Sequence, residues 1–157
     1  MLLDTIVHWI ENSFIAHAMA ASVWVYPVVE TLHMVSIAIL VGTAAMFDFR
    51  LLGWRLTSMP VAELASQLTP WIRVGIFGIA MTGPLLFASD PDRYLDNFYF
   101  RLKMTFLLLT ILFDLLVVRR LRSPDSTAGN TARRFAGGFS LLLWAGIVAG
   151  GRGIGVF

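Results

Sequence analysis

Four long apolar stretches alternate with shorter polar connections along this chain. They run over about residues 27–49, 70–88, 97–118 and 134–154. Each is close to the ~20 residues with which a helix crosses the hydrocarbon core of a bilayer. Pro70 suits the first turn of the second stretch. The pattern therefore predicts an all-α fold, an integral membrane four-helix bundle that forms one domain over residues 1–157.

The segment before the first stretch, residues 1–22, has a different pattern. Its apolar side chains recur with a helical period, at Leu3, Val7, Ile10, Phe14 and Ala21. Its charged and polar side chains fall on the opposite face, at Asp4, His8 and Glu11. A helix of this kind lies in the membrane interface and does not cross it. We therefore expect a short interfacial amphipathic helix ahead of the bundle.

Composition agrees with a membrane protein. Hydrophobic residues make up 57% of the chain and charged residues only 14%, whereas about 25% of a soluble domain is charged. The sequence has no cysteine, which excludes disulfides, thiolate metal sites and iron–sulfur clusters. The formal net charge is only +2, and the arginines flank the apolar stretches. These features favour the lipid bilayer as partner and give no support for nucleic-acid binding.

Basic residues are unevenly divided between the two ends of the predicted spans. Eight lie at one end: Arg50, Arg55, Arg73, Arg119, Arg120, Arg122, Arg133 and Arg134. Four lie at the other: Arg93, Arg101, Lys103 and Arg152. Since the more basic end of a membrane protein faces the cytoplasm, both termini are predicted to be periplasmic. The chain is expected in the inner (cytoplasmic) membrane of a bacterium, as a multi-pass protein.

The first span contains two ionisable side chains, Glu30 and His33. Their spacing of three residues places a carboxylate and an imidazole on the same helical face. Such groups are costly inside a membrane unless they are paired, hydrated or used. We therefore expect this face to point into the bundle and to form a functional site near the periplasmic surface.

Three basic side chains are predicted at the same level as this site: Arg101 and Lys103 on the third span and Arg152 on the fourth. An ion pair of Glu30 with Arg152 or Lys103 would neutralise the carboxylate. Together with His33 and His17, these residues are the candidate cofactor-binding residues.

His17 is the second candidate metal ligand beside His33. It lies on the apolar face of the N-terminal helix, and a bend near Pro27 would turn it toward His33. Small membrane cytochromes hold haem b through histidines that project into a helix bundle, with basic side chains near the propionates. Copper is the related possibility, because imidazole and thioether ligands suit it. The other candidates for a second axial ligand are Met34, Met81, Met104 and His33 of another protomer.

Haem or metal binding for electron transfer has competing interpretations. The polar cluster would equally serve as a clamp between helices in a non-catalytic accessory subunit of a larger membrane complex. A proton-linked carrier with Glu30 and His33 as a relay would need to oligomerise, because four spans form a poor pathway. The spacing Gly146-xxx-Gly150 suits either packing within the bundle or a homo-oligomer. The sequence contains no recognisable set of nucleophile, base and orienting residue, so it does not favour a hydrolytic enzyme.

Two further carboxylates lie toward the cytoplasmic ends of the spans, next to arginines. We expect structural ion pairs of Asp48 with Arg50 or Arg73, and of Asp114 with Arg119 or Arg120.

Short motifs are distributed along the chain from Pro27 to Arg152. They are Glu30-Thr31-Leu32-His33, Asp48-Phe49-Arg50-Leu51-Leu52-Gly53, Thr82-Gly83-Pro84-Leu85-Leu86-Phe87-Ala88-Ser89, Phe100-Arg101-Leu102-Lys103, and Ser140-Leu141-Leu142-Leu143-Trp144 with Gly151-Arg152. Together they resemble a poorly characterised family of small four-helix bacterial inner-membrane proteins, a domain of unknown function. The resemblance implies the fold and topology but no activity. Similar proteins tend to have an asparagine and a histidine late in the third helix. This chain has Asp114 and no histidine there, so we expect no ligand in that half.

Overall fold

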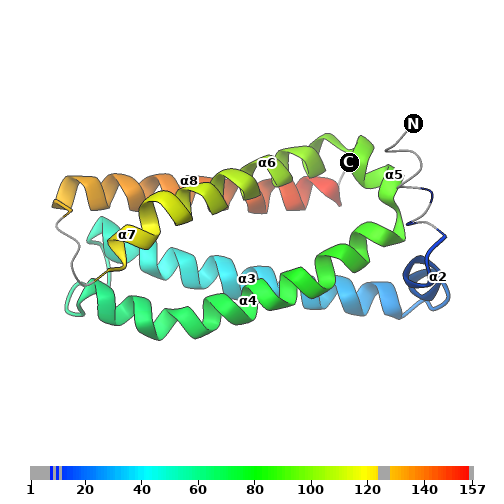
Figure 1. The fold of residues 1–157 in the computed structure, drawn as a ribbon, viewed down its shortest axis with the longest axis horizontal. Helices are drawn as coiled ribbons and strands as arrows, with labels where there is room; N and C mark the ends of the chain where they lie inside the picture. The colour runs from blue at the N-terminus through cyan, green and yellow to red at the C-terminus, as the bar shows by residue number, and fades with distance from the viewer. Residues whose placement is uncertain (1–7, 9, 11, 124–127, 156–157) are drawn as a thin grey trace.

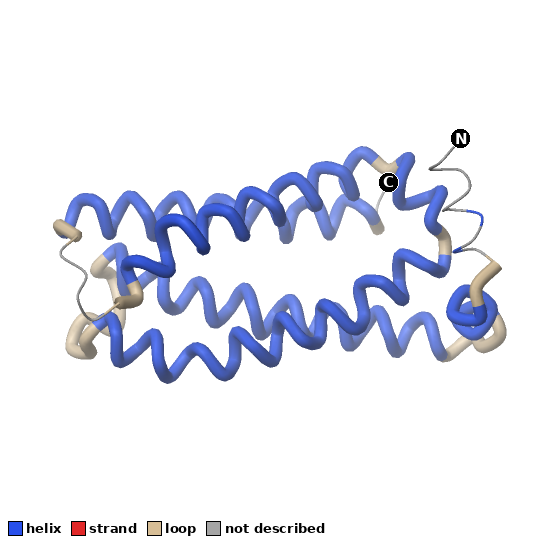
Figure 2. Tube along the Cα trace, in the orientation of Figure 1, coloured by secondary structure: helices blue, strands red, loops and turns tan. Residues whose placement is uncertain are grey.

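The computed structural model of the chain describes residues 8, 10, 12–123 and 128–155, and these are helical or in short connections without any strand (Figure 2). The helices are α2 (Phe14–Ala20), α3 (Val25–Leu52), α4 (Val61–Ser89), α5 (Pro91–Asp96), α6 (Phe98–Phe113), the π-helix η1 (Asp114–Val118), α7 (Arg119–Leu121) and α8 (Asn130–Ile154). The predicted all-α fold class is confirmed. Of the N-terminal helix predicted over residues 1–22, Leu3, Asp4, Val7 and Glu11 lie outside the described residues.

The long helices run lengthwise beside one another (Figure 1). The main contacts join α3 to α4, α6 to α8, and α3 to α8. Sequence neighbours run antiparallel: Gly75 of α4 faces Leu40 of α3, whereas Thr82, farther along α4, bonds to His33, which lies earlier in α3. The short helix α2 packs across one end of the α3–α4 pair (Figure 1).

Three of the described helices, α3, α4 and α8, are long and apolar enough to cross a membrane. They contain the predicted stretches 27–49, 70–88 and 134–154. The stretch 97–118 corresponds to α6, which has 16 residues, followed by η1. In η1 the Arg119 N–H bonds to the carbonyl of Asp114, five residues earlier. This wider turn interrupts the α-helical hydrogen bonding without ending the helical rod.

The expectation that Pro70 lies in the first turn of its helix is wrong. Helix α4 begins at Val61 and continues through both Pro70 and Pro84. A proline removes one backbone hydrogen bond, but membrane-type helices tolerate it where neighbouring helices support the backbone. Here Leu64 and Leu68 are buried before Pro70 and Gly75 is buried after it, so packing holds the helix on both sides of the proline.

A compact apolar core lies where α3, α4, α7 and α8 meet. Its buried members are Phe47, Leu51, Val61, Leu64, Ala65, Leu68, Val118, Leu121 and Ala136. The loop ends are fastened beside it, since Arg50 Nε donates to the Met59 carbonyl at 2.8 Å. Arg134 Nε likewise donates to the Leu52 carbonyl at 3.0 Å. This end of the molecule is therefore held by both apolar packing and backbone-directed arginines.

Helices α6 and α8 approach closely along a row of glycines. A Cβ atom on Gly146 would lie 2.7 Å from the Phe106 ring, and one on Gly150 would lie 3.1 Å from Lys103 Cβ. Both separations are too short for an ordinary contact, so a side chain at either glycine would push the helices apart. The Gly146-xxx-Gly150 spacing therefore serves packing within this chain.

Candidate functional site

His33 lies on the buried side of α3, where its side chain faces α4. Only 6% of the residue is exposed. Its Nδ1 lies 2.7 Å from Thr82 Oγ1, and the Thr82 hydroxyl donates to the Gly78 carbonyl at 2.6 Å. A Cβ atom on Gly83 would lie 3.6 Å from His33 Cε1, so α4 presents its least bulky surface to the imidazole. The predicted burial of His33 in the helix bundle is confirmed.

This hydrogen-bond chain selects one tautomer of His33. The Thr82 hydroxyl has a single hydrogen, which it donates to the Gly78 carbonyl. It can therefore only accept from the imidazole, so the proton of the neutral ring lies on Nδ1. Nε2 then carries the lone pair. A buried imidazole with Nδ1 tied to a polar group and Nε2 unprotonated has the form that a ligand or a base requires.

Lys103 is the basic residue that the fold brings to His33. It is half-buried on α6 and acts electrostatically on the imidazole. Its stem lies along two glycines of α8: Cβ atoms on Gly150 and Gly151 would lie 3.1 Å from Lys103 Cβ and 4.0 Å from Lys103 Cε. The glycine row thus lets a lysine stem pass between α6 and α8.

Glu30 does not point into the bundle, so that expectation is wrong. Its side chain is exposed although His33 is buried. Positions three apart on a helix differ by about 60° around the axis, which is enough to move Glu30 from the α4 interface to the edge. Among the described ion pairs there is none between Glu30 and either Arg152 or Lys103. Glu30 acts electrostatically on the phenol of Tyr94.

The remaining candidate residues lie on the surface. Arg101 and Arg152 are exposed, on α6 and in the last turn of α8. His17 is exposed on α2, whose buried positions are Ala16 and Met19. The structure does not bring His17 against His33. Within the described ranges, no group of three or more His, Cys, Asp or Glu side chains is arranged to hold a metal ion.

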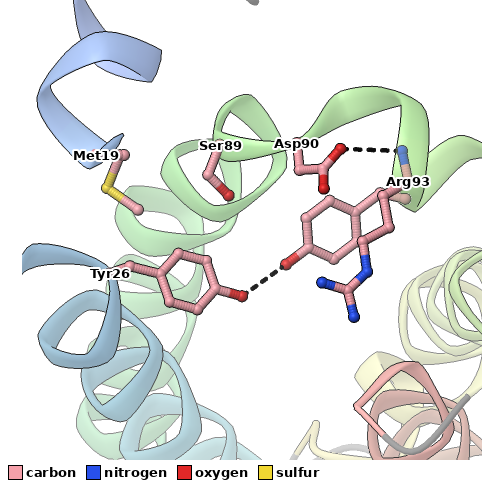
Figure 3. A pocket seen from close by; sticks show the side chains of 6 residues that line it. Met19, Tyr26, Ser89, Asp90 and Arg93 are labelled. Carbon is pink, nitrogen blue, oxygen red and sulfur yellow. Dashed lines mark hydrogen bonds between the residues drawn. The ribbon is translucent and has the colours of Figure 1, made fainter. Parts of the chain in front are cut away.

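A cavity of about 290 Å³ opens at the end of the molecule where α2, α3, α4 and α5 meet (Figure 3). It is lined by Met19, Tyr26, Ser89, Asp90, Arg93 and Tyr94. The Tyr26 and Tyr94 hydroxyls lie 3.2 Å apart and form a hydrogen bond across the cavity. Neither tyrosine is among the site residues predicted from the sequence. The cavity had no signal in the sequence, because its lining comes from helices that only the fold brings together.

Tyr94 is fixed in this cavity by its surroundings. Its ring packs against Phe87 and Phe100, with centroids 6.3 and 5.4 Å away. Asp90 caps α5 by accepting the Arg93 N–H at 3.3 Å. Burial, and then the hydrogen bond with Tyr26, raise the pKa of the Tyr94 phenol above its ordinary value. Tyr94 is therefore a neutral hydroxyl across the physiological range and a fixed hydrogen-bonding group for whatever enters the cavity.

A second polar group lies at the opposite end, beside the apolar core. Asp114 pairs with Arg122, at 2.7 Å between Oδ1 and Nη2, and not with Arg119 or Arg120, so the predicted partners are wrong. The π-turn adds about one residue to the helical repeat, so side chains eight positions apart fall on the same face. Asp48 lies at the same end of the molecule and is almost completely buried, with 1% of the residue exposed.

The expected partners of Asp48 are also wrong. Arg50 donates to a backbone carbonyl, and Arg73 is exposed. The neighbours of the Asp48 carboxyl are instead Ser140, Arg122 and Asp114. These come from α8 and from the helical rod that follows α6, so the pairing depends on tertiary packing and not on position in the sequence.

The chain was compared with protein families, curated proteins and solved structures. A model of a family of unknown function, DUF6644, matches residues 6–157. The chain belongs to this family. No curated protein and no solved structure matches it. The resemblance drawn from the motifs is confirmed, and DUF6644 membership brings no activity with it.

The activity of this DUF6644 protein therefore has to be argued from its own side chains. Along α3 from the cavity, this end of the molecule presents Tyr26 with Tyr94, then the exposed Glu30, then the buried His33, on which Lys103 acts electrostatically. The other end holds Asp48 with Asp114 and Arg122.

Proposed function

We propose that this DUF6644 protein is a multi-pass protein of the bacterial inner membrane that binds haem b through His33 and transfers electrons. In this proposal the chain forms a four-helix bundle, with α6 and η1 as the fourth span and both termini in the periplasm. Three apolar helices and the arginine-rich end around the α3–α4 and α7–α8 loops support this arrangement. The His33 end then faces the periplasm.

The observation that carries the proposal is the hydrogen-bond chain from His33 Nδ1 through Thr82 to the Gly78 carbonyl. Histidines that ligate metals almost always donate their other ring N–H to a polar group, which fixes the tautomer and the ring orientation. Thr82 occupies that position for His33. The Nε2 lone pair is therefore available to an iron atom without prior loss of a proton.

The composition of the site favours haem over a bare metal ion. A bare zinc or copper ion takes three or four protein ligands, and the described residues contain no group of three or more His, Cys, Asp or Glu side chains that could hold one. Haem supplies four nitrogen donors of its own and needs only one or two axial side chains. A single buried histidine is thus sufficient for haem and insufficient for copper, which is the second choice.

The charge beside His33 also favours haem. Haem carries two propionates, and basic side chains near the membrane surface neutralise them. Lys103 acts electrostatically on His33, and Arg101 and Arg152 are exposed on α6 and α8. A positive charge at this place would repel a free cation but would stabilise an anionic cofactor.

The number of axial ligands follows from exposure. His17 lies on the surface, and Met34, Met81 and Met104 are 51%, 56% and 45% exposed. Of these candidates His33 alone is buried, so it is the side chain that would hold the haem. A second ligand from this set would require movement of α2 to bring in His17, or a contribution from a second protomer.

An absorption spectrum of the mildly solubilised protein, oxidised and then reduced with dithionite, tests the proposal. We expect a Soret band and sharpened bands on reduction, lost in His33→Gly and retained in the matched surface variant His17→Ala. Added imidazole should restore the bands to His33→Gly, because a free imidazole can occupy the vacated space. A featureless spectrum of the intact protein would overturn haem binding. Colourless protein that co-purifies with stoichiometric partners would instead indicate an accessory subunit, and elemental analysis would detect copper.

A further inference from the structure

Among the described residues, Asp48 is the most deeply buried ionisable side chain. It lies near the C-terminal end of α3, and its residue is 1% exposed. Fifteen positions separate it from His33 along the same helix, or about 22 Å at the helical rise. Asp48 therefore belongs to neither the histidine site nor the cavity, and the proposed electron transfer does not use it.

The Asp48 carboxyl is only partly satisfied. Ser140 of α8 lies within hydrogen-bonding reach of it. Its second oxygen, Oδ2, is buried and has no hydrogen-bond partner among the described residues. An ionised carboxylate has two strongly hydrated oxygens, and leaving one of them buried without a donor is far more costly than leaving a neutral hydroxyl there.

The charges around Asp48 do not balance if both carboxyl groups are ionised. The groups that act on it electrostatically are Arg122 and Asp114. Arg122 directs both Nη atoms at Asp114, at 2.7 and 3.4 Å, and its guanidinium carbon lies 5.3 Å from the Phe47 ring centre. One guanidinium thus faces two carboxyl groups and hydrogen-bonds to only one of them. One further positive charge is needed.

A metal cation is a poor source of that charge. Hard cations take about six or more oxygen ligands, whereas Oδ2 has no polar neighbour at hydrogen-bonding distance among the described residues. The nearby Arg122 would also repel a cation. A proton requires only the one oxygen.

We propose that Asp48 is a proton-binding site, with its carboxyl group carrying a proton on Oδ2 in the folded protein. The proton exchanges with water at the Asp114–Arg122 pair, whose side chains are 39% and 27% exposed. When Oδ2–H loses its proton to water, the negative charge that remains on Asp48 is next to Arg122. Among the described residues, Arg122 supplies the guanidinium that acts electrostatically on the Asp48 carboxyl.

Infrared spectroscopy of the full chain tests this site in dodecyl maltoside, which has no carbonyl group. The wild-type protein at neutral pH should show the C=O stretch of a protonated carboxylic acid, and the band should shift in D₂O. Asp48→Asn, which keeps the size and neutrality of the side chain, should abolish the band. Asp96→Asn, the control at an exposed carboxyl of α5 far from Arg122, should retain it.

Three outcomes would overturn the assignment. The first is the absence of any protonated-carboxyl band from the wild-type protein, which would mean that Asp48 is ionised. The second is a band that persists in folded Asp48→Asn, which would assign the proton to another carboxyl. The third is a band that sodium chloride removes and choline chloride does not, which would mean that Asp48 binds sodium. Helical circular dichroism of each variant establishes that it has folded.

Discussion

His33 of α3 and Thr82 of α4 are joined by a 2.7 Å hydrogen bond between residues 49 positions apart in the sequence. The bond connects two long antiparallel helices at a place where both side chains are buried. It fixes the imidazole tautomer and also contributes to the packing of α3 on α4. These two roles can be separated by substitution.

Thr82→Val should destabilise the fold by about 1–3 kcal/mol, since it leaves the buried His33 Nδ1–H without an acceptor. Thr110→Val is the matched control. Thr110 is as buried, but its hydroxyl bonds only to its own helix, at the Phe106 carbonyl. We expect a cost below about 1 kcal/mol there. Equal losses in thermal unfolding in detergent would contradict the role of Thr82 as partner of His33.

Gly150→Ala should loosen the contact between α6 and α8. Its new Cβ would lie 3.2 Å from the Lys103 backbone nitrogen, and overpacking of this kind costs about 1–3 kcal/mol. Gly138→Ala in the same helix is the control, because its Cβ would be 3.9 Å from Leu52 Cδ2. Alanine is the better helix former by up to about 1 kcal/mol. Thermal unfolding should therefore show a loss in the first variant and no loss in the second.

Asp114→Asn should destabilise the protein more than Asp48→Asn. The first change leaves the half-buried Arg122 without its carboxylate, at an expected cost of about 1–2 kcal/mol after allowance for solvent screening. The second replaces a neutral acid with a neutral amide, for which we expect less than about 1 kcal/mol. The free energies of unfolding of the two variants measure the difference. The reverse order would show that Asp48 is the carboxylate that Arg122 stabilises.

Stability at alkaline pH should depend on Tyr94. The pKa of its phenol is raised in the folded protein, so the folded state retains the proton that the unfolded chain releases near pH 10. The stabilisation that the protonated Tyr94 phenol contributes is therefore fully present below pH 10 and is lost as the pH rises above it. Tyr94→Phe should weaken this alkaline fall, at a cost of about 0.5–1.5 kcal/mol near neutral pH for the lost hydrogen bond. Tyr26→Phe removes the same hydrogen bond but keeps the Tyr94 phenol. Melting temperatures measured from pH 8 to pH 11 would contradict the prediction if wild type and Tyr94→Phe fell in parallel.

Much of the fold follows from local features of the sequence. The length and apolarity of the stretches predicted the helical class and the presence of α3, α4 and α8. These are properties of a single segment, so they can be read without knowing which helices pack together. Helix ends were less predictable. Pro70 reads as a helix start, but Leu64 and Leu68 bury their side chains and carry α4 past it.

The candidate site divides in the same way. The sequence alone identified His33 as a buried ionisable residue and Lys103 as a basic residue at its level, since a charged position in an apolar helix is visible without a structure. Which groups meet was decided by tertiary packing. Helix rotation buried His33 against Thr82 and turned Glu30 to the surface, and a π-turn directed Asp114 to Arg122. These outcomes depend on the relative rotation and spacing of whole helices, which side-chain contacts between distant segments determine.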